Sequence, residues 1–419
     1  MILPKSKYAR NVITLMSGTG LAQAIPIAIS PILTRLYSPE EFGMFALYLA
    51  MAAILSVGAT GRYELAILLP KKDSDAMNIL ALSVFLSFIV SLLFLVVIFA
   101  FNYEMTSFLN TPEISAWLYW VPASTLLMGI YQSLNYWSNR KSHYKRLAIS
   151  RSIQSGASAV TQLGAGYIGA SIGGLIGSQL VGQVVSSAVL SQQIVHEDKL
   201  YFRKIRKKRM LLMARRYQNF PRFLILAHGF NTASAQIPVM FLTVFFSTSI
   251  AGFYMLTQRV MGVPTTLIAS AIGDVFRQEA THAYIHSGNC RDIYISTFKM
   301  LLFLSLPPSL VFIFIAPDLF AFAFGDTWRD AGIYAQILTP VFFLRFVTTP
   351  LSNMFMIAEK QKLDLVWQIG LLSMTFFSLL IGKYAASAYL AIILFATSYS
   401  AMFIINGLMT YRMATGREI

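Results

Sequence analysis

The feature that most constrains this chain is a succession of apolar segments, each close to the ~20 residues that a helix needs to cross a bilayer. Helices are expected because a spanning helix satisfies its backbone hydrogen bonds internally. The segments are too long for barrel strands and lack the strict alternation of such strands. The sequence therefore predicts an all-α polytopic membrane protein with about twelve transmembrane helices. We place these at residues 11–34, 42–60, 76–101, 114–137, 152–171, 174–195, 223–246, 251–273, 297–316, 333–357, 365–382 and 389–411.

The composition argues against a soluble protein. The chain is 56% hydrophobic and 12% charged, whereas soluble domains carry about 25% charged residues. A soluble chain of 419 residues would also be expected to divide into domains with charged surfaces and polar linkers. The sequence shows no such division.

The basic residues predict the orientation. With the N-terminus inside, 28 of the 33 Lys and Arg residues fall in cytoplasmic segments, and only Arg35, Arg329 and Lys383 fall on the opposite side. This asymmetry follows the positive-inside rule and favours an even number of spans. Both termini are therefore predicted to be cytoplasmic. The two remaining cations, Arg259 and Arg345, lie within predicted spans.

A basic run, FRKIRKKRM at 202–210, contributes to the net charge of +15. In a soluble protein such a run would suggest nucleic-acid binding. Between two apolar spans it is instead a topology determinant that can contact anionic lipid headgroups, so we expect membrane lipids and no nucleic acid as partners. The basic linker loop at 196–222 separates a predicted six-helix lobe at 1–195 from a second at 223–419.

The two halves resemble each other. AQAIPIAISPILTRLYSPEEFGMFAL (22–47) is similar to SAQIPVMFLTVFFSTSIAGFYML (234–256), with a loop three residues shorter in the second copy. Because each half would start on the cytoplasmic side, the repeat would be a parallel one. The matched residues are Ile25-Pro26 with Ile237-Pro238, and Gly43, Phe45 and Leu47 with Gly252, Tyr254 and Leu256.

The sequence favours neither catalysis nor metal binding. No Walker phosphate-binding loop is present. His282, His286 and Cys290 have the spacing of ligands on one helix face, but the intervening Ser287-Gly288-Asn289 is expected to break the helix. Acidic residues in the longest external loop leave a membrane-embedded polysaccharide polymerase or glycosyltransferase as an alternative. We expect no enzyme activity, metal or cofactor.

Three stretches carry a family resemblance. SGTGLAQAIPIAISPILTRLYSPEEFGMFAL (17–47), ATGRYELAILLPKKDSDA (59–76) and the segment from QNFPRF to DVFRQEA (218–280) resemble Wzx-type polysaccharide (O-antigen) flippases. These belong to the superfamily of multidrug, oligosaccharidyl-lipid and polysaccharide exporters. The resemblance implies two six-helix lobes around a central cationic cavity with alternating access.

The same resemblance implies a substrate and a location. The substrate would be an undecaprenyl-pyrophosphate-linked oligosaccharide, turned from the inner to the outer leaflet of the bacterial cytoplasmic (inner) membrane. Other polysaccharide assembly proteins are implied as partners.

The placement of charge discriminates within this superfamily. The 18 acidic residues lie almost entirely in loops or at span ends, whereas two arginines lie within spans. An intramembrane charge marks a functional site by default. A cation-coupled multidrug antiporter would be expected to show the reverse, a buried carboxylate. We therefore favour an anionic substrate and keep the antiporter as the alternative.

Arg259 is the leading candidate for substrate binding. It lies about eight residues, or ~12 Å of helix, inside the outer end of its span, where an arginine costs at least about 2.5–3.5 kcal/mol on insertion scales. Pro264 is expected to loosen the helix beside it. We expect Arg259, with Arg345 of span ten, to hold the pyrophosphate by charge-assisted hydrogen bonds. The alternative is an arginine bonded to backbone carbonyls freed by the kink.

Six further residues are candidates. The motif GRYELAILLP places Arg62 and Glu64 at the inner end of span two. The resemblance places this motif near the cytoplasmic mouth of the cavity, where Arg62 can receive pyrophosphate; the alternative is an interfacial anchor paired with Glu64. Arg35 can meet the head group as it leaves, or pair with Glu40 or Glu41. Side chains that can bond sugar hydroxyls, or other helices, are Gln23, Asn231 and Gln236.

The orientation is testable with topology reporters. A reporter inserted in the 203–209 run should be cytoplasmic, and one inserted near Asp326 should be external, because the positive-inside rule places these segments on opposite sides. Alkaline phosphatase and fluorescent-protein fusions measure this. Two reporters on the same side would contradict the twelve-span arrangement and the parallel repeat.

Overall fold

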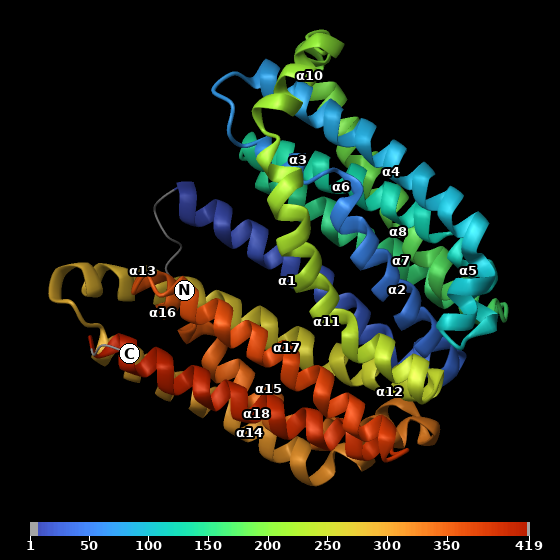
Figure 1. Ribbon diagram of the computed structural model, residues 1–419, viewed down its shortest axis with the longest axis vertical. Coiled ribbons are helices and arrows are strands. Elements are labelled where there is room, and N and C mark those ends of the chain that lie inside the picture. Colours follow the sequence, from blue (N-terminus) through green and yellow to red (C-terminus); the bar gives the residue numbers. More distant parts are fainter. Residues whose placement is uncertain (1–6, 417–419) are drawn as a thin grey trace. The chain divides into compact units, whose positions relative to one another are not determined.

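The computed structural model describes residues 7–416, and these residues form helices joined by short loops, with no strand among them (Figure 1). All twelve predicted spans coincide with helical segments. Those of the first half are α1 (Lys7–Leu36), α2 (Pro39–Ala59), α4 (Asp73–Phe108), α6 (Val121–Arg140), α7 (Tyr144–Tyr167) and α8 (Ser171–Glu197). Those of the second half are α11 (Ile225–Phe245), α12 (Thr248–Thr257) continuing into α13 (Val263–Ser287), α14 (Arg291–Phe324), α15 (Arg329–Leu351), α17 (Gln361–Tyr384) and α18 (Ala388–Ala414).

Short elements join the long helices. They are α3 (Tyr63–Ala66), α5 (Ser115–Leu118), α9 (Lys199–Phe202), α10 (Lys207–Arg216) and α16 (Met354–Ile357), with 3-10 turns at Pro112–Ile114 and Asp326–Trp328. Two turns, η2 (Phe220–Leu224) and η3 (Gln258–Gly262), are π-helical. η3 joins α12 to α13 without a loop.

The apolar helices confirm the membrane fold. Within the described residues, seven helical segments are long and apolar enough to cross a membrane by length and composition alone. The sequence expectation of an all-α polytopic membrane protein is therefore confirmed. The seven segments are Pro39–Ala59, Asp73–Phe108, Ser171–Glu197, Arg291–Phe324, Asp326–Ile357, Gln361–Tyr384 and Ala388–Ala414.

The chain forms two compact units, one up to Val244 and the other from Phe245 onward. We call them unit 1 and unit 2. By its contacts, nearly all of α11 belongs to unit 1. The lobe boundaries expected from the sequence, at 1–195, 196–222 and 223–419, stay a prediction about the functional lobes.

The internal repeat is visible in the local structure of each unit. Ser38 caps the N-terminus of α2 by accepting a hydrogen bond from the Glu41 amide, and Ser247, at the matching position of the second copy, caps α12 by accepting one from the Ile250 amide. Capping by serine satisfies an otherwise unpaired amide of the first turn. Every matched residue beyond the cap is buried in its own unit: Gly43, Phe45 and Leu47 in unit 1, and Gly252, Tyr254 and Leu256 in unit 2.

Small residues bring the helices of unit 1 close together. A Cβ atom at Gly18 of α1 would lie 2.3 Å from Cβ of Ala148 in α7, and one at Gly182 of α8 would lie 2.0 Å from Oγ of Ser158 in α7. Side chains larger than hydrogen therefore cannot fit at these positions. Close approach through small residues is the usual way in which membrane helices pack, and here it fixes α7 between α1 and α8.

A cluster of charges ties the loops at one end of unit 1 together. Arg140, the last residue of α6, donates to Oδ1 of Asp73 (2.9 Å) and to the carbonyls of Ile67 (3.0 Å) and Pro70 (2.7 Å). Nζ of Lys141 donates to Oδ2 of Asp73 at 2.8 Å. Burial works to lower the pKa of Lys141, but the hydrogen bond and charge of Asp73 outweigh it and raise the pKa above its ordinary value.

Asp73→Asn should destabilise unit 1, because it removes the carboxylate that bonds both Arg140 and Lys141 and leaves Lys141 only the more distant Asp198, at 4.0 Å. The loss should be about 1–3 kcal/mol, the usual cost of removing a partner from partly buried charged hydrogen bonds. Thermal unfolding in detergent measures it. Since the folded pKa of Lys141 is raised, its stabilisation is complete below the ordinary lysine pKa of about 10.4 and is lost as pH rises above that value.

The wild-type melting temperature should therefore fall more steeply than that of Asp73→Asn as pH rises above about 10. Asp292→Asn, at an exposed acid in the first turn of α14, is the matched control and should leave the melting temperature unchanged. Equal effects of the two variants would show that the Asp73 cluster does not stabilise the fold.

Candidate functional site

Unit 1 contains a polar cavity of about 430 Å³ between α6 and α7. Its walls carry amide, phenol and guanidinium groups, and none of the residues that line it is acidic. Most of these side chains are half-buried, so the groups are shielded but accessible. We call this cavity the α6–α7 pocket. It is lined by Tyr131, Gln132, Asn135, Tyr136, Asn139, Arg151 and Gln154.

Arg151 supplies the positive charge of the α6–α7 pocket. It lies two turns inside α7, and its Nη1 donates to the hydroxyl of Thr19 in α1 at 2.7 Å. The close approach of α1 and α7 at Gly18 and Ala148 places Thr19 within reach. A neutral hydroxyl orients the guanidinium without cancelling its charge.

The pocket also has unused hydrogen-bonding capacity. The hydroxyl of Tyr131 is buried and has no hydrogen-bond partner among the described residues. A buried hydroxyl without a partner costs free energy, so such groups call for an explanation. The amides of Gln132, Asn135 and Gln154 line the pocket and can bond the hydroxyl or phosphate oxygens of a ligand, and a ligand would reach the Tyr131 hydroxyl if the ring turned toward the pocket.

The GRYEL motif lies next to this pocket. Arg62 has a left-handed backbone (φ 59°) between α2 and α3, and its Nη1 lies 3.3 Å from Oε1 of Glu64. Glu64 is only 2% exposed and also accepts a hydrogen bond from Thr60. Both members of the Arg62–Glu64 pair act electrostatically on Tyr136 of the pocket and on His228 of α11. The structure thus brings the motif and the pocket together in unit 1.

The other predicted residues of unit 1 are more dispersed. Arg35 is exposed and donates to the carbonyl of Pro31 at 2.8 Å, while Glu41 caps α2 and bonds the hydroxyl of Ser171. Gln23 is half-buried on α1, and its Oε1 is buried with no hydrogen-bond partner in the described part of the chain. On α11, Asn231 is exposed and Gln236 is half-buried.

In unit 2, Arg259 lies in the π-helical turn η3 (Gln258–Gly262), immediately before Val263 and Pro264. The helix therefore departs from α geometry beside Pro264, as the sequence suggested. Single π turns inside helices occur frequently at functional sites. Arg259 is half-buried, and its neighbour Gln258 donates to the hydroxyl of Tyr254 at 2.8 Å.

Arg345 of α15 belongs to a polar cluster inside unit 2. It is half-buried and acts electrostatically on Tyr254 of α12 and Tyr399 of α18, and Tyr399 packs against Phe395 and Phe403 of the same helix. η3 packs on α15, where Phe342 lies against Gly262. Arg345 thus lies on a helix that the Arg259 turn contacts. Joint binding of a pyrophosphate by the two arginines stays a prediction.

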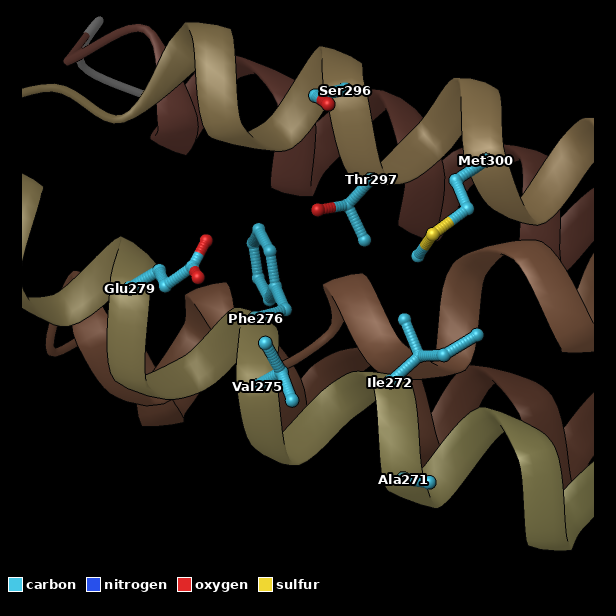
Figure 2. Close-up of a pocket in the computed structure, with 8 residues that line it drawn as sticks. All are labelled: Ala271, Ile272, Val275, Phe276, Glu279, Ser296, Thr297 and Met300. Atoms are coloured by element: carbon cyan, nitrogen blue, oxygen red, sulfur yellow. The ribbon is translucent and has the colours of Figure 1, made fainter. Parts of the chain in front are cut away.

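Unit 2 also has a pocket of a different kind, about 470 Å³ between α13 and α14. Figure 2 shows Phe276 and Ile272 of α13 facing Thr297 and Met300 of α14, with Glu279 at one end. Its lining is mainly apolar and its single ionisable group is a carboxylate. This pocket is unsuited to an anionic head group and contains none of the predicted site residues.

Sequence analysis missed the α6–α7 pocket for two reasons. The predicted span begins at residue 152, so the sequence counts Arg151 among the cytoplasmic cations, whereas helix α7 begins at Tyr144 and includes Arg151. The polar residues of α6 were hidden within an apolar segment. Their helical spacing was the available signal, because Tyr131, Asn135 and Asn139 follow one another at intervals of four residues, with Gln132 and Tyr136 beside them.

Comparisons with solved structures identify the fold. The chain is similar to an inward-facing multidrug resistance MATE family transporter of the MOP superfamily (TM-score 0.69, 14% identity, covering 94% of this chain and 93% of that one). It is also similar to a MOP superfamily transporter from Pyrococcus furiosus, described as having a binding pocket of reverse polarity that suggests a different function (0.64, 16%, 98% and 96%). A third similar structure is the MATE multidrug transporter DinF-BH (0.64, 13%, 96% and 94%).

Comparison with curated protein sequences gives no match. A family model described as "Polysaccharide biosynthesis protein" matches residues 32–332, most of the chain. Together with the fold, this match confirms the resemblance to polysaccharide exporters that the sequence motifs carry. The chain is therefore a multi-pass membrane protein that belongs to the polysaccharide biosynthesis protein family and has the fold of the MOP superfamily transporters.

Proposed function

We propose that this protein is a flippase for an undecaprenyl-pyrophosphate-linked oligosaccharide, the repeat unit of an O-antigen, capsule or exopolysaccharide. It would act by alternating access in the bacterial inner membrane, with both termini in the cytoplasm. The observation that carries the proposal is the α6–α7 pocket, in which an arginine and neutral hydrogen-bonding groups line a cavity without an acid. Membership of a polysaccharide biosynthesis family supports the same substrate class.

The pocket matches the chemistry of the proposed head group. Sugar hydroxyls both donate and accept hydrogen bonds, as do the amides of Gln132, Asn135 and Gln154. Arg151 can bind a phosphate by charge-assisted hydrogen bonds, which are shorter and stronger than neutral ones. The polyprenyl chain can stay in the bilayer while this pocket receives the polar part of the substrate.

A cation-coupled multidrug antiporter of the same superfamily is the alternative. The MATE structures share the fold, but at 13–14% identity they do not assign a substrate. Such an antiporter needs a carboxylate available to a cation. Glu64 is a buried carboxylate, but Arg62 already neutralises it, and the α6–α7 pocket has no acid in its lining. Glu279, the one carboxylate of the α13–α14 pocket, is exposed at the pocket's end rather than buried within the helices. The charge distribution therefore favours an anionic substrate.

A membrane-embedded polymerase or glycosyltransferase is disfavoured because acids of the predicted external loop already have partners. Asp318 lies 2.7 Å from Nη2 of Arg329, and Asp330 interacts with Tyr389 at the start of α18. Of the three acids in the predicted external loop, Asp318, Asp326 and Asp330, two thus have partners within unit 2. The transporter fold and the family point away from an enzyme.

Arg151→Ala should reduce flipping at least about tenfold, because it removes the one cation that lines the α6–α7 pocket; tenfold corresponds to about 1.4 kcal/mol. The measurement is leaflet exchange of a labelled lipid-linked oligosaccharide in proteoliposomes. Lys145→Ala removes an exposed cation in the first turn of α7; it is the matched control and should flip at the wild-type rate. Tyr131→Phe should also slow flipping. Wild-type rates from Arg151→Ala would remove the pocket from the mechanism.

Arg259→Ala should abolish surface glycan while leaving the protein in the membrane, because the π turn would no longer present a guanidinium to the head group. Arg259→Lys should restore display only in part, since lysine keeps the charge but not the planar fork. Surface glycan is measured by immunoblotting, and protein abundance by membrane fractionation. Arg277→Ala, an exposed arginine paired with Asp274 on α13, should display normal glycan.

Normal display from a well-expressed Arg259→Ala protein would exclude Arg259 from substrate binding. Loss of tolerance to cationic drugs in the same strain, with glycan display intact, would instead favour the multidrug antiporter.

A further inference from the structure

The segment between α8 and α11 is held in place rather than hanging as a loose linker. Asn78 of α4 is fully buried, and its side chain bonds the segment twice: Nδ2 donates to the carbonyl of Lys204 (3.1 Å) and Oδ1 accepts from the amide of Arg206 (2.9 Å). Nη1 of Arg209 lies 3.8 Å from Oδ1 of Asp75. α10 (Lys207–Arg216) is therefore a fixed element of unit 1.

One face of α10 packs against unit 1. Met213 is 3% exposed and belongs to a hydrophobic core with Met77 and Leu80 of α4, against which Met210 also packs. The hydroxyl of Tyr63 donates to the carbonyl of Ala214 at 3.0 Å. The face of α10 that carries Met210, Met213 and Ala214 is thus occupied by contacts within unit 1.

The opposite face of α10 is apolar, basic and exposed. Leu211 and Leu212 are 57% and 59% exposed, and Lys208 and Arg215 are exposed on either side of them along the helix. The spacing of these four residues, i, i+3, i+4 and i+7, places them on one face. We call this the outer face of α10. Two leucines flanked by cations match a helix that lies in a membrane interface.

The position of α10 along α4 places the outer face near the membrane surface. α4 has 36 residues and is therefore about 54 Å long, whereas the hydrocarbon core is ~30 Å thick. The ends of α4 must then reach the headgroup region or beyond. α10 packs against the beginning of α4, around Asp75 and Asn78, so this helix belongs to the end of α4 that reaches the membrane surface rather than to its hydrocarbon-spanning middle.

We propose that the outer face of α10 binds the anionic phospholipids of the leaflet beside it, with Leu211 and Leu212 inserted at the acyl boundary. Charge complementarity supports this partner: residues 199–222 contain ten Lys and Arg residues and no Asp or Glu. Polybasic segments beside a membrane are attracted to anionic lipid. The proposal goes beyond the flippase assignment and does not depend on which substrate is carried.

A polarity-sensitive fluorophore on α10 tests the proposal. The full-length protein with Cys290→Ser, which removes the one native cysteine, carries Leu212→Cys labelled with the fluorophore. It is reconstituted in phosphatidylcholine vesicles with and without phosphatidylglycerol. We expect emission to shift to shorter wavelength when phosphatidylglycerol is present, and the shift to shrink at high salt because salt screens the attraction.

Charge variants assign the effect to the outer face. Lys208→Gln with Arg215→Gln should abolish the phosphatidylglycerol-dependent shift. Arg203→Gln with Arg206→Gln removes the same number of exposed cations from the same segment but none from the outer face, and should keep the shift. Identical emission in the two lipids would overturn the proposal, as would equal loss of the shift in both double variants. The fluorescence measurement involves no transport. Neither result therefore bears on the flippase proposal, which the flipping assay tests separately.

Discussion

The hydrocarbon interior of a membrane admits irregular backbone and charge only where the protein encloses them, and this constraint organises the structure. Most of the chain is continuous helix. Two of the places where the backbone departs from it carry candidate charges: Arg62 has a left-handed conformation after α2, and Arg259 lies in the π turn η3. Both breaks follow the capped helix of a repeat copy. The repeat therefore supplies each unit with a place where charge can be held inside helical packing.

Packing in unit 1 determines which polar groups are left for a substrate. The hydroxyls of Ser152 and Ser155 of α7 donate to the carbonyls of Gly18 and Ala22 in α1, so this face of α7 is used for helix association. Such hydrogen bonds stabilise membrane helix pairs modestly. Arg151 joins the same interface through Thr19 but also lines the α6–α7 pocket. Tyr131 of α6 contributes a hydroxyl that this packing leaves without a partner among the described residues.

Hydropathy predicted the helices well because the signal is local. Each span is a run of apolar residues, and such a run predicts a membrane helix whatever its tertiary contacts are. The Arg62–Glu64 pair could also be predicted from the sequence, since its members are two residues apart. The α6–α7 pocket could not, because Arg151 and its partner Thr19 are 132 residues apart in the sequence. Helix α7 begins at Tyr144, eight residues before the predicted span, and this additional helical segment carries Arg151 to the pocket. Which face of a polar helix meets which neighbour is a tertiary property.

The partner of each arginine decides whether its charge is available to a substrate. Arg140 bonds Asp73, and Arg146 bonds Glu197 and lies 3.9 Å from Asp198; these cations are neutralised within the fold. Arg151 is oriented by the hydroxyl of Thr19, and no ion pair involves it in the described part of unit 1, so the pocket keeps a net positive charge. An anionic head group would bind Arg151 without displacing an acid, whereas binding at Arg62 must compete with Glu64. The two arginines therefore differ in what a bound anion would cost: at Arg151 no ion pair has to break, whereas at Arg62 the buried carboxylate of Glu64 would lose its partner.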